Sequence, residues 1–363
     1  MAWSTWWALV LGFSIAGIVE TFVSERRLSR LLGGRSFRAV SLGTVFGAAS
    51  SSCSFGAVAT AKALFKKGAS AEASLAAFQF ASTNLVIELG LVMWVLLGWE
   101  FVIADALAGL ILIALLVLCF RFIVPDSLIE DARKHVRGSD DTRCPTCGME
   151  VDPRDALSAE INGETHYFCS QGCMKHFQAN PRTEESTPSF RSREGWARGA
   201  ANALKEWRML WKDIVIGFIA AGLIGAFVPR EWWATLFSII GGETFLGIVF
   251  ACCVGVLIGV ATFVCSVGNV PFALILWKNG APFGAVMAFI FSDLIVPHII
   301  DSYRRYYGAR MAFTFSLLIA ACSVVAGVII HYVWDALSLI PPANELGGTA
   351  PDNYTLYLNV LFT

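Results

Sequence analysis

The sequence predicts an all-α polytopic membrane protein made of two homologous halves around a polar linker. Of its 363 residues, 56% are hydrophobic and only 15% are charged, whereas a soluble domain carries about 25% charged residues. Seven apolar runs approach or exceed the roughly 18 residues that indicate a membrane span, so the lipid bilayer is the first expected partner. These runs are Trp3–Val23, Ala69–Leu97, Phe101–Val124, Ile214–Val228, Phe245–Val264, Pro282–Ile300 and Met311–Val333.

An internal repeat is the second observation behind this fold class. Residues 43–69 align with residues 255–281 at a constant offset of 212, and twelve of the 27 positions are identical. Duplicated halves are typical of secondary transporters. The expected organisation is a first membrane half (1–125), a linker (126–211), a second membrane half (212–335) and a C-terminal tail (336–363). The identical pairs are Gly43/Gly255, Gly47/Gly259, Ala49/Ala261, Cys53/Cys265, Ser54/Ser266, Gly56/Gly268, Val58/Val270, Ala61/Ala273, Leu64/Leu276, Lys66/Lys278, Gly68/Gly280 and Ala69/Ala281.

Charge indicates how the halves are oriented. If the segment around Cys53 enters and leaves the membrane on one side, most basic groups face the cytoplasm, as the positive-inside rule favours. These groups are the loop 24–38, Lys66, Lys67, the linker, Arg304, Arg305 and Arg310, while Trp99, Glu100, the turn Pro229–Glu231 and Lys278 lie outside. The halves are then inverted repeats with broken or re-entrant helices at their cores, in the cytoplasmic membrane. The alternative is a plain eight-helix topology with broken second and sixth helices.

The core of each repeat is a small polar segment inside an apolar region. Half-helix ends near the bilayer midplane present backbone groups to a substrate, and a thiolate is a good ligand for soft metals and metalloids. We therefore expect a translocation site here, although each cysteine could instead be a small packing residue. The candidate residues are Ser52, Cys53 and Ser54 in the first half and Cys265, Ser266 and Asn269 in the second.

Ionisable side chains inside the membrane are functional candidates by default. Asn84 and Glu88 lie four residues apart, which places them on one face of a continuous helix. Asp293 aligns near Ser82 of the first half. We assign these three residues to the site, with proton coupling and structural pairing as the two roles for the carboxyls. Asp105 lies near the expected outer boundary, where solvation is the simpler interpretation.

The linker contains four closely spaced cysteines. Cys144 and Cys147 are separated by two residues, and Cys169 and Cys173 by three. Two thiol pairs at this spacing fit tetrahedral coordination of Zn or Cu, and about 40 residues need such a staple to fold. A disulfide is the alternative, which a cytoplasmic location disfavours. Alternation along 159–168 predicts a hairpin turning at Asn162 and Gly163, and 170–178 predicts a helix, giving a small ββα unit.

Two resemblances extend these interpretations. Cys-Pro-x-Cys-Gly-Met, Tyr-Phe-Cys-Ser-x-x-Cys and a terminal Asn-Pro make residues 143–182 resemble a YHS domain of the TRASH-like group. That resemblance implies binding or sensing of a soft metal such as copper or zinc. Ser52-Cys53-Ser54, Lys67-Gly68-Ala69, Ser82-Thr83-Asn84 and Phe291-Ser292-Asp293 resemble the permease family that contains the ArsP organoarsenical efflux proteins and YraQ. It implies a permease with functional cysteines, although relatives often carry a second thiol where Phe55 stands.

The functional expectation is a permease, and not an enzyme, that exports a soft metal, a metalloid or its organo- or thiol-bound form. The linker domain would sense or deliver metal in the cytoplasm. The chain has no GxxxxGK[ST] loop, so we expect no nucleotide cofactor, and we expect no nucleic-acid partner. A membrane-embedded thiol redox or metal-sensor protein without transport is the other hypothesis. The sequence makes no prediction of oligomeric state.

Overall fold

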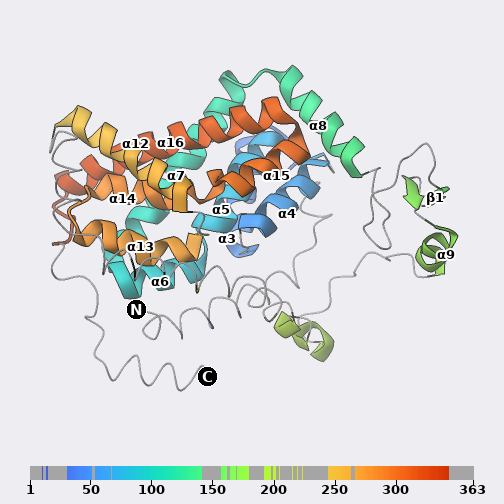
Figure 1. Ribbon diagram of the computed structural model, residues 1–363, viewed down its shortest axis with the longest axis horizontal. Coiled ribbons are helices and arrows are strands. Elements are labelled where there is room, and N and C mark those ends of the chain that lie inside the picture. Colours follow the sequence, from blue (N-terminus) through green and yellow to red (C-terminus); the bar gives the residue numbers. More distant parts are fainter. Residues whose placement is uncertain are drawn as a thin grey trace.

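The computed structural model describes most of both membrane halves and short parts of the linker. Described are residues 31–50, 54–66, 68–140, 157–161, 164–168, 170–179, 192–197, 199–201, 244–262 and 266–342, with a few single residues between them. The expected runs Trp3–Val23 and Ile214–Val228 and the tail beyond residue 342 lie outside the described residues. The described membrane halves form one bundle of helices (Figure 1).

The described part of the first half contains six helical segments, of which η1 and α5 follow each other without a turn. They are α3 (Phe37–Ser50), α4 (Ser54–Lys66), the π-helix η1 (Glu72–Phe78), α5 (Gln79–Asn84), α6 (Ile87–Leu97) and α7 (Trp99–Phe122). The second half repeats the same order with α12 (Phe245–Thr262), α13 (Ser266–Lys278), α14 (Phe283–Ile290), the 3-10 helix η2 (Phe291–Ile295), α15 (Pro297–Tyr307) and α16 (Ala309–Ala336). The chain is therefore mostly helical.

The turns of the two halves also correspond. Gly68 and Gly280 have positive φ values of 104° and 89°, and Gly98 and Gly308 have 91° and 84°. Residues with a Cβ atom rarely adopt this conformation. Each half thus changes direction at matching glycines, which carries the repeat found in the sequence into the backbone.

The chain before α3 and the chain after α4 meet, so that α3 and α4 together make a hairpin. The backbone N–H of Ser70, just after α4, donates to the carbonyl oxygen of Leu32, just before α3, at 2.9 Å. With 14 residues, α3 is about 21 Å long, shorter than the roughly 30 Å hydrocarbon core of a bilayer. Both helices pack on η1 and α5.

The helices after each hairpin are broken. Glu72–Asn84 and Ile87–Leu97 meet at 45°, and Phe283–Ile295 and Pro297–Tyr307 meet at 44°. The break in the first half corrects one expectation: Asn84 ends α5 and Glu88 lies in α6, so they do not share a face of one helix. Val86 between them is extended, with φ −100° and ψ 149°.

Close backbone approach packs α3 on η1 and α12 on α14. A Cβ atom added to Gly43 would lie 2.6 Å from the carbonyl oxygen of Ala73, and one added to Gly255 would collide with the carbonyl oxygen of Ala285. Ala285 stands 212 residues after Ala73, so the two contacts correspond. Small residues let helices approach closely in membranes, which explains why these glycines recur in both halves.

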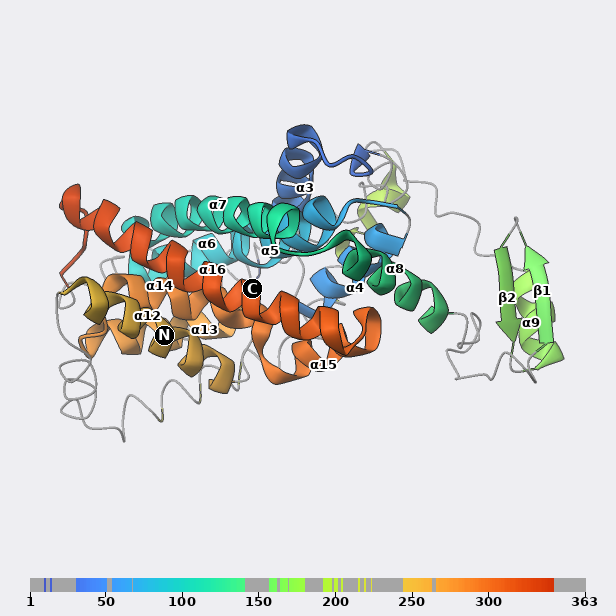
Figure 2. The ribbon, with the colours of Figure 1, turned by 90° about the horizontal axis from the view of Figure 1, so that it is seen from above.

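The two long helices, α7 and α16, pack against each other in opposite directions (Figure 2). Phe120 near the end of α7 contacts Phe315 near the start of α16, with ring centroids 5.6 Å apart. At the other end, Phe101 of α7 contacts Phe283, which stacks on Trp334 of α16. By length and composition, α7 and α16 can each cross a membrane, and the described residues give up to four spans if each bent pair is one.

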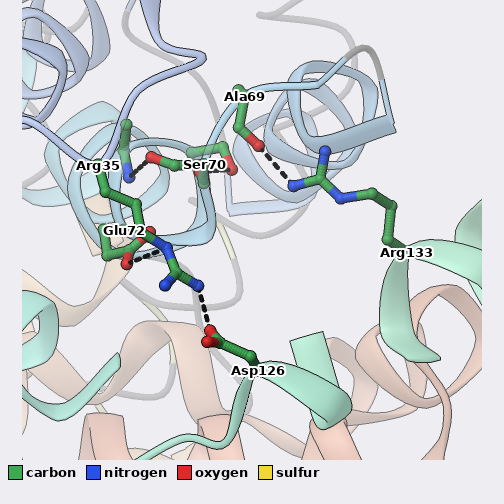
Figure 3. Close-up of polar contacts among 8 residues, drawn as sticks. Arg35, Ala69, Ser70, Glu72, Asp126 and Arg133 are labelled. Atoms are coloured by element: carbon green, nitrogen blue, oxygen red, sulfur yellow. Dashed lines mark hydrogen bonds and ion pairs between the residues drawn. The ribbon is translucent and has the colours of Figure 1, made fainter. Parts of the chain in front are cut away.

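α8 (Asp126–Asp140) continues from α7 and packs on α4, α15 and α16. Arg35 pairs with Asp126 and, at 3.2 Å, with buried Glu72 (Figure 3). The hydrogen bond from Arg35 and its positive charge hold the pKa of the exposed Asp126 carboxyl below its ordinary value. Arg133 donates to the carbonyl oxygen of Ala69 at 2.9 Å. The base of the hairpin is thus tied to the start of the linker.

The linker contains a two-stranded antiparallel sheet followed by a helix. β1 (Leu157–Ile161) pairs with β2 (Glu164–Phe168), with Ile161 opposite Glu164 and Leu157 opposite Phe168. This register agrees with the hairpin expected from alternation along the sequence. α9 (Gln171–Ala179) packs on both strands. In Figures 1 and 2 these three elements lie beyond the end of α8.

Candidate functional site

A buried carboxyl group joins the two repeat cores. Asp293, fully buried in η2, accepts hydrogen bonds from two serine hydroxyls at the same oxygen, Oδ2. These are Ser54 of α4, at 3.2 Å, and Ser266 of α13. They are equivalent residues of the repeat and the first residues of their helices. The second oxygen, Oδ1, accepts from the amide nitrogen of Asn84 at 3.1 Å.

The Asp293 carboxyl group can be buried because three hydrogen-bond donors, one each from α4, α13 and α5, contact it. A buried polar group costs free energy unless it is hydrogen-bonded, and hydroxyl and amide donors offset that cost for the Asp293 side chain. The structure pairs no cation with Asp293 among the residues it describes. The observed contacts of Asp293 are therefore three hydrogen bonds from neutral donors.

Aromatic and small polar side chains enclose this cluster, which is defined as Ser54, Asn84, Ser266 and Asp293. Phe80 and Phe291 contact edge to face at 5.7 Å, and Phe272 stacks on Phe289 at 5.2 Å. Gln79 donates to the Tyr303 hydroxyl, which connects α5 to α15. These contacts hold η2 and α5 at a fixed spacing around the cluster.

The expected site residues fall into three groups. Ser54, Asn84, Ser266 and Asp293 converge in the cluster. Asn269 is fully buried on α13, one turn after Ser266, and Glu88 is buried in the first turn of α6. Ser52, Cys53 and Cys265 lie outside the described residues, so their role stays a prediction.

Asp105 is a residue that the sequence interpretation misjudged. It is only 4% exposed, and its Oδ1 atom has no hydrogen-bond partner among the residues that the structure describes. It faces inward because buried residues recur along α7 at helical spacing, including Phe101, Ala108 and Leu112. That spacing was available in the sequence, but α7 is apolar all round, so hydrophobicity alone did not reveal the inward face.

The linker cysteines are less fully described. Cys173 is half-buried on α9, and its backbone N–H donates to the Ser170 hydroxyl at 3.3 Å. Cys144, Cys147 and Cys169 lie outside the described residues. Within the described ranges, no three His, Cys, Asp or Glu side chains are grouped to hold a metal ion. Zinc or copper binding therefore stays a prediction.

Apolar spans, broken helices and a polar cluster between two repeats define a membrane transport protein. The chain belongs to the family ArsP_1, described as "Predicted permease", whose model matches residues 1–332. It is 36% identical over 343 residues to "Putative permease Rv2963" of Mycobacterium tuberculosis, covering 94% of this chain and 77% of that protein.

A second relative is more distant. The chain is 32% identical over 132 residues to the UPF0718 protein YcgR of Bacillus subtilis, which covers 36% of this chain and 42% of that protein. No solved structure matches the chain. Membership of this family identifies the chain as a permease, which is a class of membrane transporter, and does not identify its cargo.

Proposed function

We propose that this permease exports a soft metal, a metalloid or its organo- or thiol-bound form across the cytoplasmic membrane. One observation carries the proposal: the serines that follow Cys53 and Cys265 both bond to one oxygen of Asp293. Because Cys53 and Cys265 directly precede these serines in the sequence, we propose that their thiols and this carboxyl group together form the cargo site. Two thiols and a carboxylate suit a thiophilic cation.

The arrangement of the halves supports an inverted repeat. α7 and α16 are corresponding helices that run in opposite directions, and the hairpin ends at Leu32 and Ser70 meet on one side. We propose that α3 and α4 form a re-entrant segment, with Cys53 among the three residues that join the two helices in the sequence. In such transporters, discontinuous helices place their ends at the substrate near the midplane.

Transport by proteoliposomes containing the purified chain tests the proposal. With phenylarsine oxide, Cu(I) and Zn(II) as probes, we expect flux of at least one that falls about tenfold or more in Cys53→Ser and Cys265→Ser. Such a loss corresponds to about 1.4 kcal/mol of lost interaction or more. Cys253→Ser is the matched control, because Cys253 lies on α12 and aligns with Ser41, so it has no cysteine partner in the repeat. Cysteine-independent flux, or none, would overturn it.

The alternative, a thiol redox or sensor protein, gives a different result in the same vesicles. It predicts reversible disulfide formation between Cys53 and Cys265 with no flux of any probe. The family assignment favours transport over this alternative.

The linker domain is proposed to bind zinc or copper through Cys144, Cys147, Cys169 and Cys173 and to sense or deliver metal. The order of hairpin and helix supports it, because β2 ends directly before Cys169 and α9 carries Cys173. Four thiolates match the donor set that Zn(II) and Cu(I) prefer. The full chain should bind about one more metal ion than a Cys169→Ser/Cys173→Ser variant; equal binding by both would refute the assignment.

A further inference from the structure

A cavity between α6 and α7 leads toward the buried cluster. Its volume is about 490 Å³, and its polar lining comes from Asn84 and Asp105. The remaining lining is apolar and includes Trp94 and Trp99. Trp99 is half exposed at the start of α7, and Asp105 lies six residues further, about 9 Å along the helix. The cavity therefore connects the Trp99 end of the bundle with the interior.

Two oxygen atoms beside this cavity have no hydrogen-bond partner within the described part of the chain. They are the buried Oδ1 atoms of Asp105 and Asn84. The amide nitrogen of the same Asn84 side chain donates to Asp293. Asn84 thus stands between the cavity and the cluster, with its donor facing Asp293 and its acceptor unused.

The chemistry of these atoms indicates which ligand they take. Metal cations with hard character need many oxygen ligands, six or more for Ca²⁺ and Mg²⁺, and the cavity offers only these two side chains among apolar neighbours. A proton needs one carboxyl oxygen. Buried charge is costly unless it is paired, so an Asp105 side chain without a partner favours the protonated form.

We infer that Asp105 is a proton-binding carboxyl that is reached through the α6–α7 cavity and coupled to the charge state of Asp293. The inference rests on the proposed permease function and supplies its coupling ion. Asn84 lines the same cavity as Asp105 and donates a hydrogen bond to Asp293, so one amide stands between the two buried carboxyl groups, and an ionised Asp293 opposes ionisation of Asp105. A positive cargo at Asp293 would remove that opposition and release the proton, which couples cargo binding to proton movement.

Other titratable groups lie on the helices around Asp105. Glu88 lies on α6, and His331 on α16 has its Nδ1 atom engaged by the backbone N–H of Gly284. Glu100 lies five residues before Asp105 on α7 itself, at the Trp99 end. Asp293 differs from these groups because it is hydrogen-bonded to Asn84, which lines the same cavity as Asp105.

Dicyclohexylcarbodiimide, an apolar reagent that adds to protonated carboxyl groups, tests the inference on the purified full-length protein. We expect mass spectrometry to find modification at Asp105, falling about tenfold per pH unit above the pKa of the group. In Asp293→Asn the labelling curve should move toward lower pH by on the order of one unit, because the amide carries no charge to repel Asp105. Asp105→Glu should keep the labelling at position 105.

Asp335→Asn is the control, because it removes an exposed carboxyl group from the end of α16 and should leave the labelling of Asp105 unchanged. Absence of modification at Asp105, labelling that does not vary with pH, or an unchanged curve in Asp293→Asn would each overturn the inference. The labelling experiment needs no cargo. If labelling fails, the proposed permease function is unaffected, and if no cargo flux is found, the labelling result can still be interpreted.

Discussion

At the scale of single residues, the cluster is held together by one hydrogen-bond acceptor, Oδ2 of Asp293, which a serine of each repeat contacts. Ser54 and Ser266 bond to the same oxygen of Asp293, so neither half can move far without losing a bond to a buried carboxyl group. Hydrogen bonds to charged groups contribute about 1.5–3 kcal/mol each. The cluster therefore stabilises the contact between the halves as well as forming a site.

We expect Ser54→Ala and Ser266→Ala each to lower the free energy of unfolding in mixed micelles by about 1–3 kcal/mol, because each removes a donor from buried Asp293. Ser316→Ala is the control: the Ser316 hydroxyl is buried on α16 without a hydrogen-bond partner, so its removal should cost less than about 0.5 kcal/mol. Equal effects of all three substitutions would show that the shared acceptor does not stabilise the halves.

The residues of this cluster were all predictable, but their convergence was not. Small polar residues recurring at offset 212 identified Ser54 and Ser266, and a carboxyl in an apolar run identified Asp293. Which oxygen they share depends on how the halves pack, and no local pattern encodes that. Asp105 was misjudged for a related reason: sequence distance from the boundary does not report which way a side chain faces.

At the scale of elements, close helix contacts explain the repeated glycines. Gly43→Ala and Gly255→Ala should each destabilise the protein by about 1–3 kcal/mol, since the added methyl group meets a backbone carbonyl of η1 or α14. Gly90→Ala on α6 is the matched control, because its nearest neighbour would be 3.8 Å away. Thermal unfolding midpoints would distinguish them; a Gly43→Ala protein as stable as Gly90→Ala would contradict this packing.

Arg35 pairs with Glu72 of η1 and Asp126 of α8, and we expect the pair with Glu72 to contribute more to stability. Asp126 is 77% exposed, and such exposed pairs contribute about 0–1 kcal/mol. Glu72 is 4% exposed, so Arg35→Ala leaves a buried carboxyl group without its cation. Since solvent reaches the half-exposed Arg35, we expect a loss of about 1–3 kcal/mol. Glu72→Gln should restore most of it in Arg35→Ala, and a failure of this rescue would argue against the ion pair.

The two broken helices differ in how visible they were in the sequence. The second breaks at Val296, directly before Pro297, and a residue before proline is disfavoured in helical conformation. The first breaks at Leu85 and Val86 within an apolar run that contains no proline or glycine at that point. Helix propensity therefore predicted a continuous helix there. In the structure the helix is broken, and Leu85 at the break packs against Gly109 of α7.

At the scale of the whole molecule, several of the basic side chains used to predict orientation lie at one end of the bundle. Arg35, Arg133 and Arg310 lie at the end formed by α8 and the start of α16. Trp277, next to Lys278, contacts Phe101 at the opposite end, near Glu100. The positive-inside rule favours a cytoplasmic α8 end, and this orientation stays a prediction. The turn Pro229–Glu231 lies outside the described residues.

If the halves are inverted repeats, the corresponding helices α7 and α16 run in opposite directions. A cross-link between two native cysteines, one on each helix, can test this. Cys119 near the end of α7 faces Cys322 in the middle of α16, with their sulfur atoms 3.9 Å apart. A short thiol-specific cross-linker such as dibromobimane should join them within one chain, detected as a linked peptide pair by mass spectrometry. Cys119→Ser should abolish the link, while Cys253→Ser should preserve it.

Parallel helices aligned at their starts would place Cys119 and Cys322 about seven residues, roughly 10 Å, apart along the axis, beyond the reach of this reagent. Absence of the link in a folded chain would therefore argue against inverted halves, and with them against the pairing of Ser54 and Ser266 at one carboxyl.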